Sequence, residues 1–276
     1  MPSVINTNVL SLVAQSNLTN SQMKQSNAVK ELSSGLRINS AKDDPAGLAI
    51  SARMQAQVNG MNQAVRNSND AIGLANTADG ALGSVSNMLQ QMRTLAVQSS
   101  NGTNGTADQA NLDAEYQALG KEITRELTNT QFNGLNILGS NAGTVTYQVG
   151  ANSTDQIAVT TTNLTSSTTI SSVTTGGVAS AASASAAITA IDSALTQVNQ
   201  ERANYGADSI RFQQVVSTLQ INSQNTAAAE SQIMDTDYAQ ATSALTAAQI
   251  VQQAGTTMLA QANSIPQNVL SLMKNM

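Results

Sequence analysis

The chain has 276 residues, contains no histidine and no cysteine, and carries a formal net charge of −5. These counts exclude disulfides, zinc sites built on His or Cys, and catalytic groups that need either residue type. The acidic balance also argues against nucleic-acid binding, which requires a basic face.

The N-terminal segment predicts a helix rather than a leader. It begins Met1-Pro2-Ser3-Val4 and has neither a basic stretch nor an apolar run of signal-peptide length. We therefore expect a cytoplasmic chain, or one exported without a cleaved signal. The first helix is expected from about Asn6 to Gly35, and the next begins at Asp44-Pro45, an acidic N-cap followed by proline.

Long helices are expected over most of the remaining chain. Proline occurs only at positions 2, 45 and 266, so 220 consecutive residues carry none. Apolar or small residues recur in steps of three and four over residues 50–96, 112–130, 188–233 and 234–272. This spacing is typical of helices packed lengthwise. Aromatic residues make up only 2% of the chain, so these helices must pack through small side chains.

The middle of the chain has a different pattern. Asn133-Gly134 is a turn signal, and residues 144–149 and 156–159 alternate between apolar and polar side chains. One or two β-hairpins are expected there. Residues 160–185 are rich in Ser, Thr, Gly and Ala and predict a surface loop. The predicted fold class is mainly α, with long coiled-coil-like helices and a small β-hairpin region.

The two ends of the chain lack charge. Residues 1–23 and 238–273 contain no charged side chain, although both segments have a wide apolar stripe. Asn, Gln, Ser and Thr together account for 115 of the 276 residues, so polarity comes from uncharged groups. A surface without charge is prone to association. We expect the two ends to pair and to be buried against other copies; the alternative is an antiparallel helix pair inside one monomer.

The motifs that could suggest a metal or phosphate site are better explained by structural roles. Asp43 and Asp44, like Asp235 and Asp237, suit the start of a helix better than a metal site. Gly102 and Gly105 favour a turn over a phosphate loop, because no strand precedes them and no Gly-Lys-Ser/Thr follows. We expect no enzyme activity, no metal and no cofactor.

Two long motifs resemble a known family. They are Leu32-Ser33-Ser34-Gly35-Leu36-Arg37-Ile38-Asn39-Ser40-Ala41-Lys42-Asp43-Asp44-Pro45-Ala46-Gly47-Leu48-Ala49-Ile50, and residues 249–263 with Pro266-Gln267-Asn268-Val269-Leu270-Ser271-Leu272. Both closely resemble bacterial flagellin, as do Val4-Ile5-Asn6-Thr7-Asn8 and Phe132-Asn133-Gly134. The resemblance covers roughly residues 1–140 and 186–276.

The resemblance implies a structural subunit that self-assembles into the flagellar filament for swimming. The paired terminal helices, residues 1–43 and 235–276, would form the inner domain D0. Residues 44–234 would form the helical bundle D1, with the hairpin and loop region at about 133–185 and no large outer domain. The residues expected in the filament core are Leu10, Leu18, Leu32, Leu245, Val251, Leu259, Val269 and Leu272.

The resemblance also implies partners and an extracellular location. Export would proceed unfolded through the flagellar type III apparatus, with a cytoplasmic chaperone, followed by contacts with filament cap and hook-junction proteins. No membrane insertion is expected. A vertebrate flagellin receptor would contact Gln90, Gln91, Thr94, Leu95 and Gln98; Gln91 and Thr94 replace the Arg and Glu usual in strongly recognised members. Candidate glycosylation sites are Thr160, Thr161, Thr162, Ser166 and Ser167.

Two other functions share parts of this pattern. A hook–filament junction protein has flagellin-like ends, and an exported adhesin would use the Ser/Thr-rich middle to bind surfaces. Both stay open as alternatives to the filament subunit.

Overall fold

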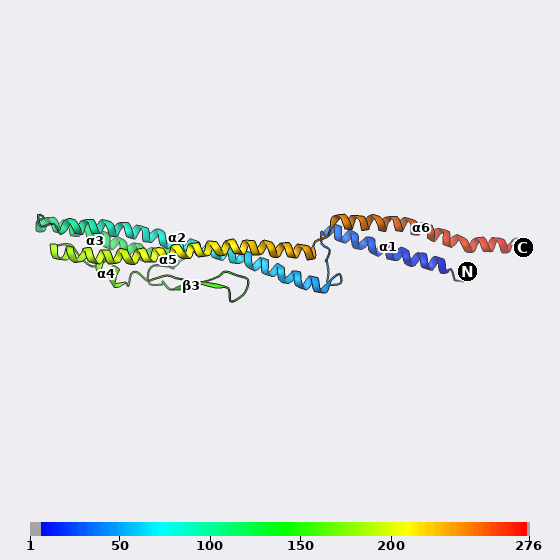
Figure 1. The fold of residues 1–276 in the computed structure, drawn as a ribbon, viewed down its shortest axis with the longest axis horizontal. Helices are drawn as coiled ribbons and strands as arrows, with labels where there is room; N and C mark the ends of the chain where they lie inside the picture. The colour runs from blue at the N-terminus through cyan, green and yellow to red at the C-terminus, as the bar shows by residue number, and fades with distance from the viewer. Residues whose placement is uncertain (1–6, 275–276) are drawn as a thin grey trace. The chain divides into compact units, whose positions relative to one another are not determined.

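The computed structural model describes residues 7–274, with side chains up to residue 265. Within this range the chain is mainly α-helical, as predicted, with two small two-stranded sheets (Figure 1). The helices are α1 Val9–Ser34, α2 Pro45–Ser99, α3 Thr106–Asn129, α4 Thr168–Thr174, α5 Ala181–Met234 and α6 Tyr238–Lys274. The strands are β1 Gln131–Phe132, β2 Leu135–Asn136, β3 Thr144–Gln148 and β4 Gln156–Thr160.

The chain forms two compact units. The terminal unit combines residues 1–56 with residues 225–276, and the central unit comprises residues 57–224. The long helices α2 and α5 each contribute to both units.

Helix ends in the terminal unit follow the predicted side-chain chemistry. The Asp44 carboxylate accepts hydrogen bonds from the backbone N–H groups of Ala46 and Gly47 at the start of α2. Asp237 accepts in the same way from Ala239 and Gln240 at the start of α6. These contacts satisfy helix N–H groups that have no intrahelical partner, so both carboxylates have a structural role. Gly35 ends α1 with φ 72°, a conformation that favours glycine.

The core of the central unit forms where α2, α3 and α5 pack together with the loop segments. It is built from aliphatic residues and alanines on α2, three large residues on α3, and a stripe on α5 that ends at Phe212. The Phe212 ring meets the Tyr147 ring of β3 edge-on, with centroids 5.8 Å apart and an interplanar angle of 76°. This contact ties the β3–β4 hairpin to the helices.

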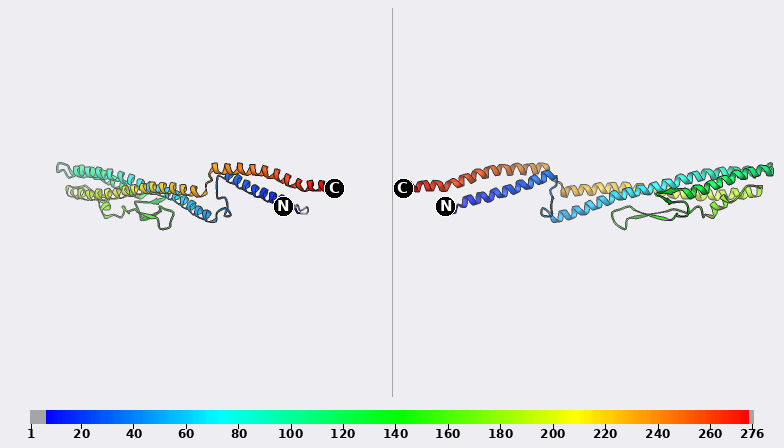
Figure 2. Two further views of the ribbon diagram at one scale, coloured as in Figure 1. Left: turned by 45° about the vertical axis from the view of Figure 1, so that its right-hand side comes forward. Right: turned by 180° about the vertical axis from the view of Figure 1, so that it is seen from behind.

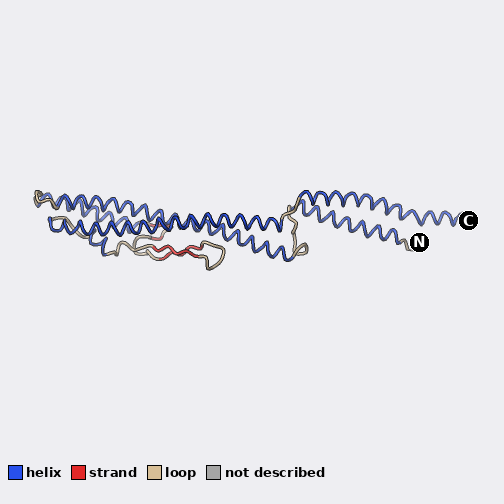
Figure 3. The backbone as a smooth tube through the Cα atoms, viewed as in Figure 1, coloured by secondary structure: helices blue, strands red, loops and turns tan. Residues whose placement is uncertain are grey.

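The structure has two hairpins where one or two were predicted (Figure 3). The turn between β1 and β2 has Asn133 at φ 51° and Gly134 at φ 78°, the positive-φ pair that a tight hairpin turn requires. Strands β3 and β4 pair antiparallel from Thr144 opposite Thr160 to Gln148 opposite Gln156. Ile157 and Val159 of β4 are buried while their neighbours face solvent, which is the alternation seen in the sequence.

The prediction of a surface loop over residues 160–185 was wrong in part. The segment contains the short helix α4 and the first turn of α5, and its isolated apolar side chains Leu164, Ile170, Val173 and Val178 are buried in the core. Hydrogen bonds also fix its path: the Ser99 hydroxyl donates to the Val178 carbonyl, and the Val178 N–H donates to Asp113. A few spaced apolar anchors hold this Ser/Thr-rich segment against the helices. Helix α6 continues past Pro266 to Lys274, in line with the spacing over residues 234–272.

Two tyrosines predict an alkaline weakness of the central unit. Tyr116 and Tyr205 are buried, and the Tyr116 hydroxyl has no hydrogen-bond partner among the described residues, whereas the Tyr205 hydroxyl lies near the Thr162 backbone. Burial, reinforced by Asp113 and Glu201 respectively, raises the pKa of each phenol to about 12, against about 10 in an unfolded chain. The folded state therefore keeps its phenol protons up to higher pH than the unfolded state does. The contribution of the two phenols to the free energy of unfolding is fully present below pH 10. It is lost between pH 10 and about 12, by on the order of 2 kcal/mol per tyrosine.

Denaturant unfolding at pH 8 and pH 11.5 checks this expectation. The double variant Tyr116→Phe, Tyr205→Phe should lose much less stability between the two pH values. It should unfold at a similar denaturant concentration at pH 8, since the Tyr116 hydroxyl that it removes is buried without a partner. An equal loss in the variant and the parent chain would assign the alkaline effect to other groups.

Candidate self-assembly surface

Helices α1 and α6 pair antiparallel within one chain, and the views in Figures 1 and 2 agree on this arrangement. Hydrogen bonds join them along their length: the Asn8 side chain donates to the Ala262 carbonyl at 2.8 Å, and the Ser21 hydroxyl donates to the Ala248 carbonyl at 2.9 Å. At the other end, the Tyr238 hydroxyl donates to the Leu32 carbonyl at 3.2 Å. The pairing expected of the two charge-free ends therefore occurs inside the monomer.

The interface between these helices uses small side chains. Ser21 and Ala28 of α1 are buried, as are Ala241, Ala248 and Ala262 of α6. A Cβ added at Gly255 would lie 3.4 Å from the Leu18 side chain, so the helices approach closely at this glycine. Small residues bring the backbones together but leave the larger apolar side chains at the edges of the pair.

Large apolar side chains remain exposed on this pair of helices. Leu10 is 52% exposed and Val251 is 53% exposed. Both lie in segments of the sequence that contain no charged residue. A groove of about 400 Å³ runs between the helices and is walled mainly by apolar groups. We call it the terminal groove; its lining is Leu10, Val13, Ala14, Asn17, Val251, Ala254, Gly255, Met258, Gln261, Ala262 and Ile265.

The residues expected in the filament core fall into three groups. Leu10 and Val251 line the terminal groove and are exposed. Leu18, Leu32, Leu245 and Leu259 are half-buried in the terminal unit. Val269 and Leu272 lie in the part of α6 whose side chains are outside the described residues.

Sequence reasoning missed part of the exposed apolar surface. More than half of the side chain is exposed at Val9, Leu12 and Val13 of α1 and at Ile250 of α6. None of these four was among the residues expected in the filament core. The sequence did carry a sign of this surface, because pairs of adjacent apolar residues such as Leu12-Val13 occur in the charge-free ends. A second apolar face on a helix whose first face already has a partner indicates a further partner.

Within residues 7–274, no helix is long and apolar enough to cross a membrane.

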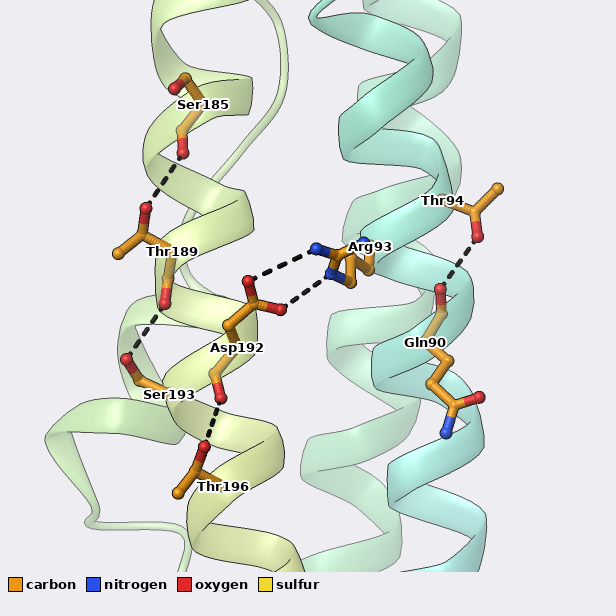
Figure 4. Close-up of polar contacts among 8 residues, drawn as sticks. All are labelled: Gln90, Arg93, Thr94, Ser185, Thr189, Asp192, Ser193 and Thr196. Atoms are coloured by element: carbon orange, nitrogen blue, oxygen red, sulfur yellow. Dashed lines mark hydrogen bonds and ion pairs between the residues drawn. The ribbon is translucent and has the colours of Figure 1, made fainter.

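The expected receptor-facing residues form a polar strip on α2. Gln90, Gln91, Thr94 and Gln98 are exposed, and the Thr94 hydroxyl donates to the Gln90 carbonyl at 3.1 Å. Leu95, in contrast, is only 8% exposed and belongs to the core. Figure 4 shows Arg93 on the side of α2 that faces α5, paired with Asp192, where Nε lies 2.8 Å from Oδ1. The hydrogen bond from Arg93 lowers the pKa of Asp192.

The candidate glycosylation sites differ in access. Thr160 and Ser166 are exposed, whereas Thr162 and Ser167 are half-buried and the Ser167 hydroxyl donates to the side chain of Gln197. Thr161 is buried, and its hydroxyl both donates to the Gly143 carbonyl and accepts from the Gly143 N–H. A glycan on Thr161 would require this corner of the hairpin to open.

Comparison with known proteins assigns the chain to a family. The model of the bacterial flagellin N-terminal helical region matches residues 5–142, and that of the C-terminal helical region matches residues 188–273. A flagellin of Halalkalibacterium halodurans is 44% identical over 98% of this chain and 100% of its own length. The chain belongs to the bacterial flagellin family.

Solved structures agree with this assignment. The crystal structure of Bacillus cereus flagellin is 34% identical, covers 60% of this chain and 94% of its own, and superposes with a TM-score of 0.51. A structure of a putative flagellar hook-associated protein from Vibrio parahaemolyticus, 15% identical, covers 70% of this chain and 100% of its own with a TM-score of 0.58. At that identity the second likeness shows the shared fold alone.

Membership in the flagellin family fixes the function in outline. The chain is a structural subunit that self-assembles into the bacterial flagellar filament, outside the cell, and it is not an enzyme. The match extends over the full length of the Halalkalibacterium halodurans flagellin and over 98% of the chain, which supports a short form with D0 and D1 only. The hook-junction and adhesin alternatives gain no comparable support.

Proposed function

We propose that the terminal groove is where one flagellin subunit binds the terminal helices of other copies in the filament core. Its exposed apolar walls carry this proposal, since they lie on the two segments of the chain that contain no charge. Apolar burial at about 25 cal/mol per Å² would drive the association. A head-to-tail contact of this kind extends into a filament when the rotation between subunits does not close.

We also propose that the terminal helices, residues 1–43 and 235–276, act as the D0 domain and residues 44–234 as D1. The support is that α1 ends at Ser34 and α6 begins at Tyr238, and that the strands from Gln131 to Thr160 belong to the central unit. The compact units themselves divide further along α2 and α5, so residues 44–56 and 225–234 belong to the terminal unit. The core-forming roles of Leu18, Leu32, Leu245, Leu259, Val269 and Leu272 are part of this proposal.

Electron microscopy of the full chain, beside a chain lacking residues 1–40 and 240–276, tests the role of the ends. After seeding, the full chain should form long filaments. The deleted chain should remain soluble and helical, because the central unit has its own core. Filaments from the deleted chain would contradict the proposal, and short, finite polymers from the full chain would favour a junction protein.

The route and the other partners are further proposals. They comprise unfolded export through the type III apparatus, a cytoplasmic export chaperone, and contacts with cap and hook-junction proteins. The half-buried and exposed apolar residues of α6 support the need for a chaperone, because an isolated α6 would present them to water.

Recognition by a vertebrate flagellin receptor is a second proposal, supported by the exposure of Gln90, Gln91, Thr94 and Gln98 on one strip of α2. The Leu95 side chain is buried in the core, so Leu95 would support the strip by anchoring α2 rather than by touching the receptor. The double variant Gln91→Arg, Thr94→Glu restores the usual charges and should lower the half-maximal concentration in a receptor reporter assay about tenfold. No change would argue against this strip as the recognition surface.

A further inference from the structure

Met258 is the most exposed methionine among the described side chains. It is 63% exposed and lines the terminal groove, where its neighbours include Val251 and Ile265. Met23 on α1 is also exposed, at 55%, but it does not line that groove. Met61 and Met92 are buried in the central unit. Among the described side chains, the terminal groove therefore presents one thioether to solvent, that of Met258.

We propose that Met258 is a site of reversible oxidation that blocks assembly of the free subunit, with hydroperoxides as the oxidant. This inference rests on the proposed burial of the terminal groove in the filament. The Met258 sulfur attacks one peroxide oxygen, the O–O bond breaks, and an S–O bond forms. Sulfur loses two electrons to the peroxide, and the leaving oxygen takes up a proton to become water or an alcohol.

Oxidation changes what the groove can bury. A thioether is apolar and adaptable, whereas a sulfoxide is polar and is costly to desolvate against walls made largely of Leu, Val, Ala and Ile. Losing the burial of one methionine side chain corresponds to a rise in critical concentration of about tenfold or more. In an assembled filament Met258 would be covered, so the same peroxide should oxidise it far more slowly.

The experiment treats the full-length monomer with hydrogen peroxide, quenches it, and measures seeded growth and the sulfoxide content of each methionine peptide by mass spectrometry. Variants Met258→Leu and Met23→Leu form the matched pair, since leucine keeps volume and helix propensity. Oxidised parent chain and oxidised Met23→Leu should show at least about a tenfold higher critical concentration. Oxidised Met258→Leu should have the same critical concentration as untreated Met258→Leu, and the two methionine sulfoxide reductases should restore the parent chain.

Three results would overturn the inference. The first is normal growth of parent chain whose Met258 is fully oxidised. The second is an equal loss of growth in oxidised Met258→Leu, which would assign the effect to another methionine. The third is oxidation of Met258 at the same rate in filaments and monomers. A separate Leu10→Asp variant distinguishes failure of the oxidation proposal from failure of the groove proposal. If Leu10→Asp fails to assemble while the oxidised parent chain grows, the terminal groove still binds other copies and only the oxidation proposal falls.

Discussion

Replacing Leu10 with Asp is expected to abolish filament growth while leaving the monomer folded. Leu10 is half exposed in the single chain, so a carboxylate there stays hydrated and the α1–α6 pair should form as before. In the filament the same carboxylate would be buried against apolar groups without a partner, at a cost of several kcal/mol. Seeded growth followed by light scattering should show a critical concentration raised at least about 100-fold.

Leu10→Met is the matched control, because it keeps an apolar side chain of similar volume. It should assemble within about threefold of the parent chain. Filaments of normal length from Leu10→Asp would place Leu10 outside the subunit contacts. The same change at Val269 or Leu272 should also block assembly, although the side chains there lie outside the described residues.

The second large effect is expected at Phe212, in the core of the central unit. Phe212→Ala should lower the free energy of unfolding by about 3–5 kcal/mol, because it leaves a cavity and removes the edge-on contact with Tyr147. Denaturant unfolding measures the change. Ile210→Ala, two residues away on the same helix and 69% exposed, should change it by less than about 0.5 kcal/mol.

Equal destabilisation by the two variants would contradict the orientation of α5. If Phe212→Ala lowers the free energy of unfolding only slightly, the hairpin and helices repack around the missing ring.

The helices were predictable because their signals are local and repeated. Three-and-four spacing, the absence of proline and the carboxylates at Asp44 and Asp237 all act within a few residues, and the structure has helices where these signals coincide. The turn at Asn133-Gly134 is equally local, since the two residues tolerate positive φ.

The errors arose where burial depends on distant partners. Ile170 and Val173 stand alone among serines and threonines, and only the neighbouring helices make them core residues. Thr161 looked accessible in sequence, but its hydroxyl is bonded to Gly143 across the hairpin. Leu95 shares a strip of sequence with exposed glutamines while pointing into the core, because neighbouring positions on a helix face different directions. Pairing of the two ends within one chain was similarly beyond what the charge pattern could decide.

The most direct test of the account measures the accessibility of the terminal groove before and after assembly. The chain has no cysteine, so Val251→Cys creates a single reactive thiol on the groove wall with little change in size. Maleimide should label it in the monomer at nearly the rate seen in the urea-unfolded chain. In sedimented filaments, labelling should be more than about 100-fold slower, because reaction then requires local opening. Equal labelling rates in monomer and filament would show that other copies leave the groove uncovered and would contradict the account.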